Sequence, residues 1–337
     1  MAKMQYYYEL TVSSSPHQHS PVTTQTIMRD VLIALTPALI GSVYFFGLRA
    51  LMVTLVSAAA CVFFEWGYRK IMKLDSTAHD LSAVVTGVLL AFVCPPTIPY
   101  WTIILGDLFA IVLVKQLFGG IGQNFVNPAL AGRAFMFSWA TLMSTWVKVG
   151  FSNSVGIFAD VSAEALDGMT AATPLSYLHQ GVLPTDSTWI DCLVGNVGGC
   201  IGETSAILLT IGFVYLLYRK VISARIPLFY IGTVAVLTFL FPLGNDRIAW
   251  MAAQVFGGGL MLGAIFMATD YVTSPVTKLG QVVYGIGCGL LTVLIRYFGG
   301  YNEGVSYAIL IMNACVVLLD RIGRPVKFGA PKKEAAK

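Results

Sequence analysis

The chain has 337 residues, of which 56% are hydrophobic and 11% are charged, and its formal net charge at pH 7 is +4. A water-soluble globule of this length needs more polar surface, so the composition excludes the soluble classes and predicts an integral membrane protein. The small positive charge is typical of a protein oriented in a membrane, and no nucleic-acid partner is expected.

The first 26 residues are polar and lack the apolar core of a cleavable signal peptide, which predicts an N-terminal arm. Ten apolar stretches follow. We expect about ten transmembrane helices, although several stretches are shorter than the roughly 20 residues that a crossing needs. The stretches lie near residues 27–47, 51–66, 81–94, 101–114, 128–147, 190–218, 226–243, 248–269, 281–297 and 305–319.

The basic residues predict how these spans are oriented. If both termini are cytoplasmic, only Arg49, Lys148, Arg247 and Arg296 fall on the outer side, as the positive-inside rule requires. The polar loop between the fifth and sixth stretches then faces outward. The predicted segments are a cytoplasmic arm (1–26), a first membrane repeat (27–147), an outer loop (148–189), a second membrane repeat (190–320) and a basic cytoplasmic tail (321–337).

Glycine and proline interrupt several of the apolar stretches. The breaks fall at Cys94-Pro95-Pro96 and 124–133 in the first half, and at 195–202 and Gly257-Gly258-Gly259 in the second half. Short, broken spans at corresponding places in two halves are typical of an internal repeat whose discontinuous helices meet near the membrane midplane. We therefore predict an all-α fold of two inverted five-helix repeats.

Within the outer loop, the run from Asp167 to Leu175 ends in Thr173-Pro174-Leu175. This pattern predicts a helix that begins at Pro174, with Thr173 as its N-cap. The backbone N–H groups at a helix N-terminus favour negative charge, so a phosphate esterified to the Thr173 hydroxyl would be stabilised there. Capping alone is the structural alternative.

A carboxylate and several hydroxyls follow the eighth apolar stretch. Asp270 lies beside Thr269, and Thr273 follows three residues later. Oxygen ligands of this kind suit a hard cation such as Na⁺, so Asp270, Thr269 and Thr273 are candidates for a sodium path. Helix capping and a salt bridge from Asp270 to Lys278 are the alternative.

Four runs resemble one known family of membrane subunits. They are Asp167–Thr173, Asn127–Phe135, Phe266–Asp270 and Tyr301–Gly304. The family contains the D subunit of the Rnf complex and the B subunit of the sodium-translocating NADH:quinone reductase, and the resemblance extends from Thr77 to Pro325. Two positions depart from the common pattern, because Thr170 stands where serine is common and Ala171 where glycine is common.

The resemblance implies a flavoprotein. A flavinyltransferase would recognise the run containing Asp167, Gly168 and Thr170 and join FMN through its phosphate to Thr173. Asn127 and Arg133 are further expected cofactor contacts. A second, noncovalent flavin, riboflavin, is expected between the helix halves, and the fold is expected to be similar to that of urea transporters.

The resemblance also implies a place in a larger assembly. The chain is expected to be a translocase subunit, not catalytic alone, in the bacterial cytoplasmic (inner) membrane. It would pass electrons through FMN and couple them to Na⁺ or H⁺ transport in a ferredoxin:NAD⁺ oxidoreductase. Its expected partners are membrane lipid, the flavinyltransferase and the Rnf subunits A, B, C, E and G.

Arg133 lies within an apolar stretch, where an unpaired charge is expensive. A salt bridge with Asp107 or Glu203 would stabilise the fold. Alternatively, Arg133 could hold the flavin phosphate or the N1/O2 edge of the ring, where a positive charge stabilises the reduced flavin anion. The two roles are compatible, and both stay open.

The other ionisable and sulfur-containing residues give weaker signals. Glu65 lies between Phe64 and Trp66 and is expected to anchor an interface. The six cysteines contain no Cys-x-x-Cys pair, so neither zinc nor an iron–sulfur centre is predicted.

Three rival functions are open. A urea or ammonium channel would use the same broken helices without redox chemistry, and a structural anchor would only assemble the complex. The third is the role of the B subunit in the quinone reductase, although the long N-terminal extension of that protein is absent here, which favours Rnf.

Overall fold

A computed structural model describes residues 22–146, 156–157, 173–184, 188–203 and 205–322. Within these residues the protein is helical and contains no β-strand, which confirms the all-α prediction for this part of the chain. The motif residues Asp167, Gly168 and Thr170 lie outside the described residues.

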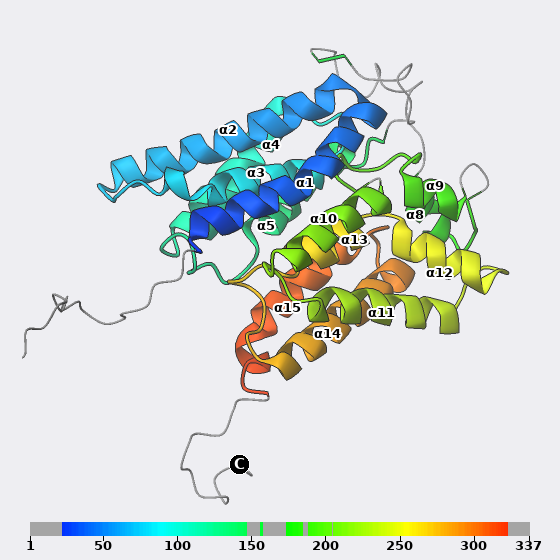
Figure 1. The fold of residues 1–337 in the computed structure, drawn as a ribbon. Helices are drawn as coiled ribbons and strands as arrows, with labels where there is room; N and C mark the ends of the chain where they lie inside the picture. The colour runs from blue at the N-terminus through cyan, green and yellow to red at the C-terminus, as the bar shows by residue number, and fades with distance from the viewer. Residues whose placement is uncertain (1–21, 147–155, 158–172, 185–187, 204, 323–337) are drawn as a thin grey trace, which may run out of the picture.

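Five helices of the N-terminal half form one group (Figure 1). Helix α2 packs against α3 and against α4, which continues as the π-helix η2, and α4 packs against α5. The group consists of α1 (Thr24–Phe46), α2 (Leu48–Ile71), α3 (Ser82–Phe92), α4 (Tyr100–Leu108), η2 (Phe109–Gln116) and α5 (Pro128–Met136), with the short helices η1 (Ala78–Asp80), η3 (Phe137–Trp139) and α6 (Ala140–Met143).

Local sequence explains where these helices begin and end. Gly47 separates α1 from α2 at a φ of 81°, a conformation that favours glycine. Asn127 accepts hydrogen bonds from the N–H groups of Ala129 and Leu130, and Pro128 occupies the first position of α5. The predicted span 128–147 is divided because the backbone at Trp139 leaves the helical region between η3 and α6.

The C-terminal half forms a second group with the same order of packing. Helix α11 packs against α12 and α14, and α14 packs against α15. The group consists of α10 (Ala206–Tyr218), α11 (Arg225–Leu240), α12 (Arg247–Phe256), α13 (Leu260–Leu262), the π-helix η5 (Gly263–Met267), α14 (Lys278–Phe298) and α15 (Val305–Leu319). Between α12 and the segment Leu260–Met267 the axis bends by 59°, at the predicted triple-glycine break.

Two short helices, α8 (Pro174–His179) and α9 (Trp189–Val194), precede the second group. Gly195 ends α9 in the left-handed conformation, and the following loop returns to the end of α3. There the N–H groups of Ile201 and Gly202 donate to the carbonyls of Cys94 and Phe92. The predicted interruption at 195–202 is therefore present, and it joins the two groups.

The groups meet along two further helix pairs, α1 with α10 and α5 with α15 (Figure 1). A continuous cluster of buried apolar side chains runs through both, from Leu35 and Phe92 in the first group to Leu262 and Ile309 in the second.

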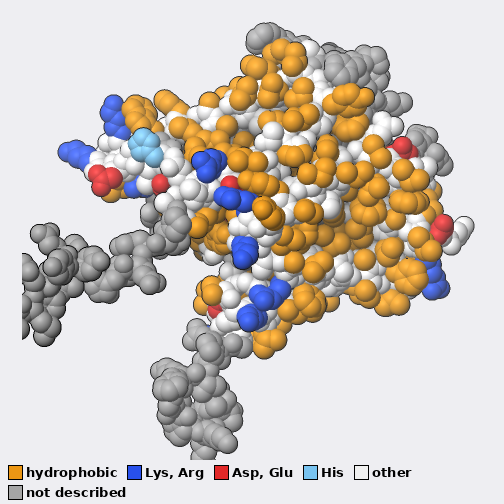
Figure 2. Space-filling model, in the orientation of Figure 1, with side chains coloured by type: hydrophobic (Ala, Val, Ile, Leu, Met, Phe, Trp, Pro, Cys, Tyr) orange, Lys and Arg blue, Asp and Glu red, His pale blue; other side chains and the backbone are white. Residues whose placement is uncertain are grey.

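The outer surface is strongly apolar. Figure 2 shows hydrophobic side chains over most of one face, with most of the Lys and Arg side chains in its left half and a few charged side chains at its right edge. Among the described residues, α1, α2 and α14 are long and apolar enough to cross a bilayer, and the bent pair Arg247–Phe256 and Leu260–Met267 makes a fourth span if it is counted as one. This surface is that of a membrane protein.

Candidate functional site

A cavity of about 230 Å³ lies between the two helix groups. Its wall combines aromatic and aliphatic side chains with a few charged ones. Both Thr173 and Arg133 border it, so the structure brings these two predicted site residues together. The other lining residues are Phe137, Ala140, Met143, Ser144, Trp146, Pro174, Leu175, Val197, Gly198, Gly199, Cys200, Glu203, Phe256, Gly258, Gly300, Tyr301, Asn302 and Glu303.

Thr173 occupies the predicted N-cap position of α8, with Pro174 following as the first helical residue. Its side chain makes no capping hydrogen bond, contrary to the capping role predicted for the hydroxyl. Instead its carbonyl accepts a hydrogen bond of 2.7 Å from the Ser176 hydroxyl. Thr173 lines the cavity and is 9% exposed, and its hydroxyl does not cap the helix.

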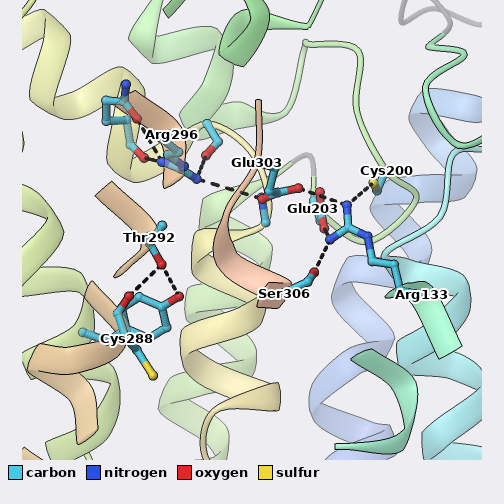
Figure 3. Close-up of polar contacts among 12 residues, drawn as sticks. Arg133, Cys200, Glu203, Cys288, Thr292, Arg296, Glu303 and Ser306 are labelled. Carbon is cyan, nitrogen blue, oxygen red and sulfur yellow. Dashed lines mark hydrogen bonds and ion pairs between the residues drawn. The ribbon is translucent and has the colours of Figure 1, made fainter. Parts of the chain in front are cut away.

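Beneath the cavity lies a buried charged cluster, drawn in Figure 3. The Arg133 guanidinium donates to the Ser306 hydroxyl at 2.6 Å and to the Glu303 carboxylate at 3.1 Å. Glu203 lies 3.7 Å from the same guanidinium, which confirms one of the two predicted ion pairs. The cluster therefore links α5 to the loops before α10 and α15.

The alternative pairing of Arg133 with Asp107 is wrong. Asp107 lies on the face of α4 that packs against α2, where it accepts hydrogen bonds from Ser57 at 2.7 Å and from the Cys61 thiol at 3.2 Å. Arg133 extends from α5 towards α15, so the two side chains have different neighbours.

A second guanidinium completes the cluster. Arg296 of α14 lies 4.0 Å from Glu303 and donates to the carbonyls of Gln254 and Gly257 at the end of α12. Glu303 also accepts from the Gly259 N–H in the same break. The break after α12 leaves backbone N–H and C=O groups without helical hydrogen bonds. Arg296 and Glu303 supply hydrogen-bond partners for three of these groups.

Three atoms of the cluster have no hydrogen-bond partner among the described residues: Arg133 Nε, Glu203 Oε1 and Arg296 Nε. Of these residues, Arg133 and Glu203 border the cavity, and both are almost fully buried. A buried polar atom without a partner is costly, so such atoms indicate a site where a further group is accommodated.

Asn127 and Asp270 border a different cavity, of about 340 Å³. The Asn127 side chain caps α5 and donates to the Met267 carbonyl at 3.3 Å. Asn127 is the N-cap of α5, and Arg133 lies six residues further along the chain in the same helix. The predicted cofactor-binding residues are therefore divided between two cavities. Lys115 and Tyr271 also line the second one.

The residues of the predicted sodium path are only partly grouped. The Thr273 hydroxyl donates to Asp270 at 3.1 Å, whereas the Thr269 hydroxyl donates to the Ile265 carbonyl of its own helix. Burial raises the pKa of the Asp270 carboxyl, and hydrogen bonds from Thr273 and from backbone N–H groups oppose that rise. Among the described residues, none of the ion pairs includes Asp270, so the alternative salt bridge to Lys278 is absent.

Three buried charges were missed or misinterpreted from the sequence. Glu65 is not an interface anchor, because it is 1% exposed and pairs with Lys115 at 2.7 Å. Arg49 donates to the carbonyls of Pro96 and Ile98 after α3. The spacing of Ser57, Cys61 and Glu65 on α2, four residues apart, is a signal that could have predicted a buried polar stripe.

Comparison with known proteins gives a consistent result. The sequence model of the NQR2, RnfD, RnfE family matches residues 11–329. The chain is 46% identical over 331 residues to the D subunit of the Na(+)-translocating ferredoxin:NAD(+) oxidoreductase complex of Acetobacterium woodii, covering 97% of this chain and 98% of the relative. It is 42% identical to the D subunit of the proton-translocating ferredoxin:NAD(+) oxidoreductase complex of Clostridium ljungdahlii, over 95% and 96% of the two chains. It is 35% identical to the D subunit of the ion-translocating oxidoreductase complex of Actinobacillus succinogenes, over 93% and 96%.

Proposed function

The chain belongs to the NQR2, RnfD, RnfE family, and we propose on that basis that it is the flavin-carrying membrane subunit of an ion-translocating ferredoxin:NAD⁺ oxidoreductase. Its relatives are subunits of ion-translocating oxidoreductase complexes, so it acts within an assembly and not alone. The other subunits of that complex, A, B, C, E and G, are its partners in this proposal, and the bacterial cytoplasmic membrane, with both termini cytoplasmic, is its location.

FMN is joined through its phosphate to Thr173 in this proposal. The observation that carries it is the position of Thr173, which lines a cavity and whose hydroxyl does not cap the helix. A flavinyltransferase would attach the cofactor as a phosphoester, with the preceding run as its recognition sequence. Attachment of the cofactor to that hydroxyl would break no helix-capping hydrogen bond in the described part of the chain.

The cavity wall fits a flavin chemically. Phe137, Trp146, Phe256 and Tyr301 supply aromatic and apolar surface for a ring system. The unpartnered Arg133 Nε and Glu203 Oε1 supply polar groups for its heteroatoms. Since the cavity holds about 230 Å³, it encloses only part of FMN, and the remainder would lie at the mouth.

Each residue of the site has a physical role in this proposal. A flavin bound there supplies one- or two-electron transfer. Arg133 and Glu303 fix the cavity floor by joining α5 to the start of α15. Because the charges of Glu203 and Glu303 already balance those of Arg133 and Arg296, the contribution of Arg133 is to orient the cofactor by hydrogen bonding and not to offer a free cation for the phosphate.

The proposed coupling ion is Na⁺ or H⁺, and its path includes the second cavity. Asp270 and Asn127 line that cavity together, and Thr273 contacts Asp270. Riboflavin as a second, noncovalent flavin between the helix halves remains part of the proposal, with this cavity as its candidate place.

The proposed architecture is ten membrane helices in two inverted five-helix repeats. The order of packing supports it, because α2 contacts α3 and α4 as α11 contacts α12 and α14. The pairs α1 with α10 and α5 with α15 then relate equivalent helices of the two repeats.

In-gel flavin fluorescence after denaturation tests the proposal. Wild type and Thr173→Ser, which keeps a hydroxyl, are expected to fluoresce when co-expressed with the flavinyltransferase, and Thr173→Ala is expected to lose the signal. Fluorescence retained by Thr173→Ala would refute the attachment site, and loss in Thr170→Ala alone would move it to that hydroxyl.

The same experiment separates the rival functions. A urea- or ammonium-type channel or a structural anchor predicts no covalent flavin in wild type. The B subunit of a sodium-translocating NADH:quinone reductase also predicts fluorescence, and it is distinguished by the electron acceptor, which would be a quinone and not NAD⁺.

A further inference from the structure

The two carboxylates of the charged cluster differ in how their oxygens are bonded. In Glu303, Oε1 accepts from the Gly259 N–H and Oε2 accepts from Arg133 at 3.1 Å. In Glu203, Oε1 lies 3.7 Å from Arg133, beyond hydrogen-bond distance, and it has no hydrogen-bond partner among the described residues. Figure 3 shows both carboxylates directed towards Arg133.

Glu203 is also at the cavity. Its side chain is 4% exposed and borders the same cavity as Thr173. Tyr301 and Asn302 of the cavity wall are exposed, so the cavity extends to the surface of the described part of the protein. Glu203 thus combines burial, an unpartnered oxygen and access to the cavity.

The charges around Glu203 are balanced when both carboxylates are ionised. Arg133 on α5 and Arg296 on α14 supply two positive charges, and Glu203 and Glu303 supply two negative ones. Other titratable side chains near Glu203 are the buried thiols of Cys200 and Cys94 and the phenol of Tyr301, which lines the same cavity. Arginine is always protonated, so the cluster cannot gain positive charge from its guanidinium groups.

A negative charge added to the cavity would therefore be uncompensated in a poorly solvated environment. Protonating Glu303 would cost its hydrogen bond to Arg133 or to Gly259. Protonating Glu203 costs no hydrogen bond at Oε1, because that oxygen accepts none among the described residues.

We propose that Glu203 binds a proton from water at the cavity mouth when an electron is placed on the flavin at Thr173. The inference rests on the proposed function. One electron comes from a one-electron carrier of a partner subunit and stays on the flavin, and one proton goes to the Glu203 carboxylate. On reoxidation both leave, and no other bond forms or breaks.

The test is the pH dependence of the FMN midpoint potential in the purified complex. One proton per electron gives a slope of about 59 mV per pH unit. In wild type the slope is expected to approach this value over the pH range in which Glu203 titrates, and in Glu203→Gln it is expected to flatten there. Asp246→Asn is the matched control, because it removes a carboxylate away from the cavity and keeps the N-cap of α12, and its slope should equal that of wild type.

Equal slopes in wild type and Glu203→Gln, with FMN fluorescence retained in both, would overturn the inference and leave the proposed function intact. Absence of covalent flavin from wild type would overturn both. Redox-difference infrared spectra of wild type give an independent readout if the variant does not assemble. A protonated-carboxyl band should appear on reduction and shift in Glu203→Asp, and its absence from wild type would also refute the proposal.

Discussion

At the scale of single residues, the interior of this protein is organised by paired charges. Arg133 contacts two carboxylates and one hydroxyl from segments far apart in the sequence. A buried charge is tolerated only when it is paired and hydrogen-bonded, so each partner is needed once the other is present. Glu65 and Lys115 follow the same rule between α2 and η2.

Replacing Arg133 with alanine removes the ion-pair partner of Glu203 and leaves Glu303 with Arg296 alone, 4.0 Å away. We expect a loss of about 3–5 kcal/mol in the free energy of unfolding, measured by denaturant or thermal unfolding in detergent. Arg219→Ala is the control, since the Arg219 side chain is 46% exposed and solvent screens its ion pair with Asp30, so its removal should cost far less stability. Equal losses in the two variants would contradict the prediction.

The pair of Glu65 and Lys115 permits a double-mutant cycle. Lys115→Met alone leaves the buried Glu65 carboxylate without its ion-pair partner and is expected to destabilise the protein by about 3–5 kcal/mol. The double variant Glu65→Leu with Lys115→Met should recover most of that loss, because replacing both charges with apolar groups is often neutral. A double variant as unstable as the sum of the single ones would show that the pair is not energetically coupled.

Sequence reasoning found part of this residue-level picture. The position of Arg133 in an apolar stretch required a carboxylate partner, and Glu203 was one of two candidates. Glu303 belongs to the run Tyr301–Gly304 but had no predicted role, because nothing in the sequence brings residues 170 positions apart together. Asp107 was an equally good candidate by composition, and only the packing of α4 against α2 excludes it.

At the scale of secondary-structure elements, broken helices define the site, and each of two breaks is capped by a guanidinium. Arg49 donates to the carbonyls that follow α3, and Arg296 donates to those at the end of α12. In an apolar interior no water is present to donate hydrogen bonds to these carbonyls, so the arginine side chains donate them instead. Glycine and proline predicted where the breaks lie, but they gave no indication of these caps or of the π-helices η2 and η5.

Gly259, in the break after α12, is predicted to be sensitive to substitution, because the carboxylates nearest to it are held by Arg133 and by a backbone N–H. A Cβ atom there would lie 2.5 Å from Glu203 and 2.8 Å from Glu303, so Gly259→Ala must displace at least one carboxylate. We expect lower stability and loss of covalent flavin, measured by unfolding and in-gel fluorescence. Gly232→Ala in α11 meets nothing within 4 Å and is expected to be stabilising by about 0.5–1 kcal/mol. Unchanged stability and unchanged flavin fluorescence in Gly259→Ala would contradict the close packing of Gly259 against the two carboxylates.

At the scale of the whole molecule, composition alone predicted a membrane protein, and the helical groups have the apolar surface that it requires. The number of crossings could not be settled by the same reasoning. Several apolar helices, such as α3 and α10, are shorter than a bilayer is thick, and their role depends on neighbours that hydropathy does not encode.

The proposed orientation places Lys73 and Arg247 on opposite sides of the membrane. Both residues are exposed at helix ends, the first after α2 and the second at the start of α12. Single cysteines introduced at these positions in a cysteine-free background should differ in labelling by a membrane-impermeant thiol reagent applied to intact cells. Only the cysteine at position 247 is expected to react, and labelling at position 73 alone would reverse the topology.

Helix α5 also has a consequence for how a membrane voltage acts on this protein. Asn127 lines one cavity and Arg133 the other, and six helical residues correspond to about 9 Å. If the cavities are hydrated from opposite sides, the electric field is concentrated across this thin septum instead of the full bilayer. The electrical energy of moving one elementary charge across the membrane is roughly 2.3 kcal/mol per 100 mV. Nearly all of that energy would then be gained or lost within two turns of α5.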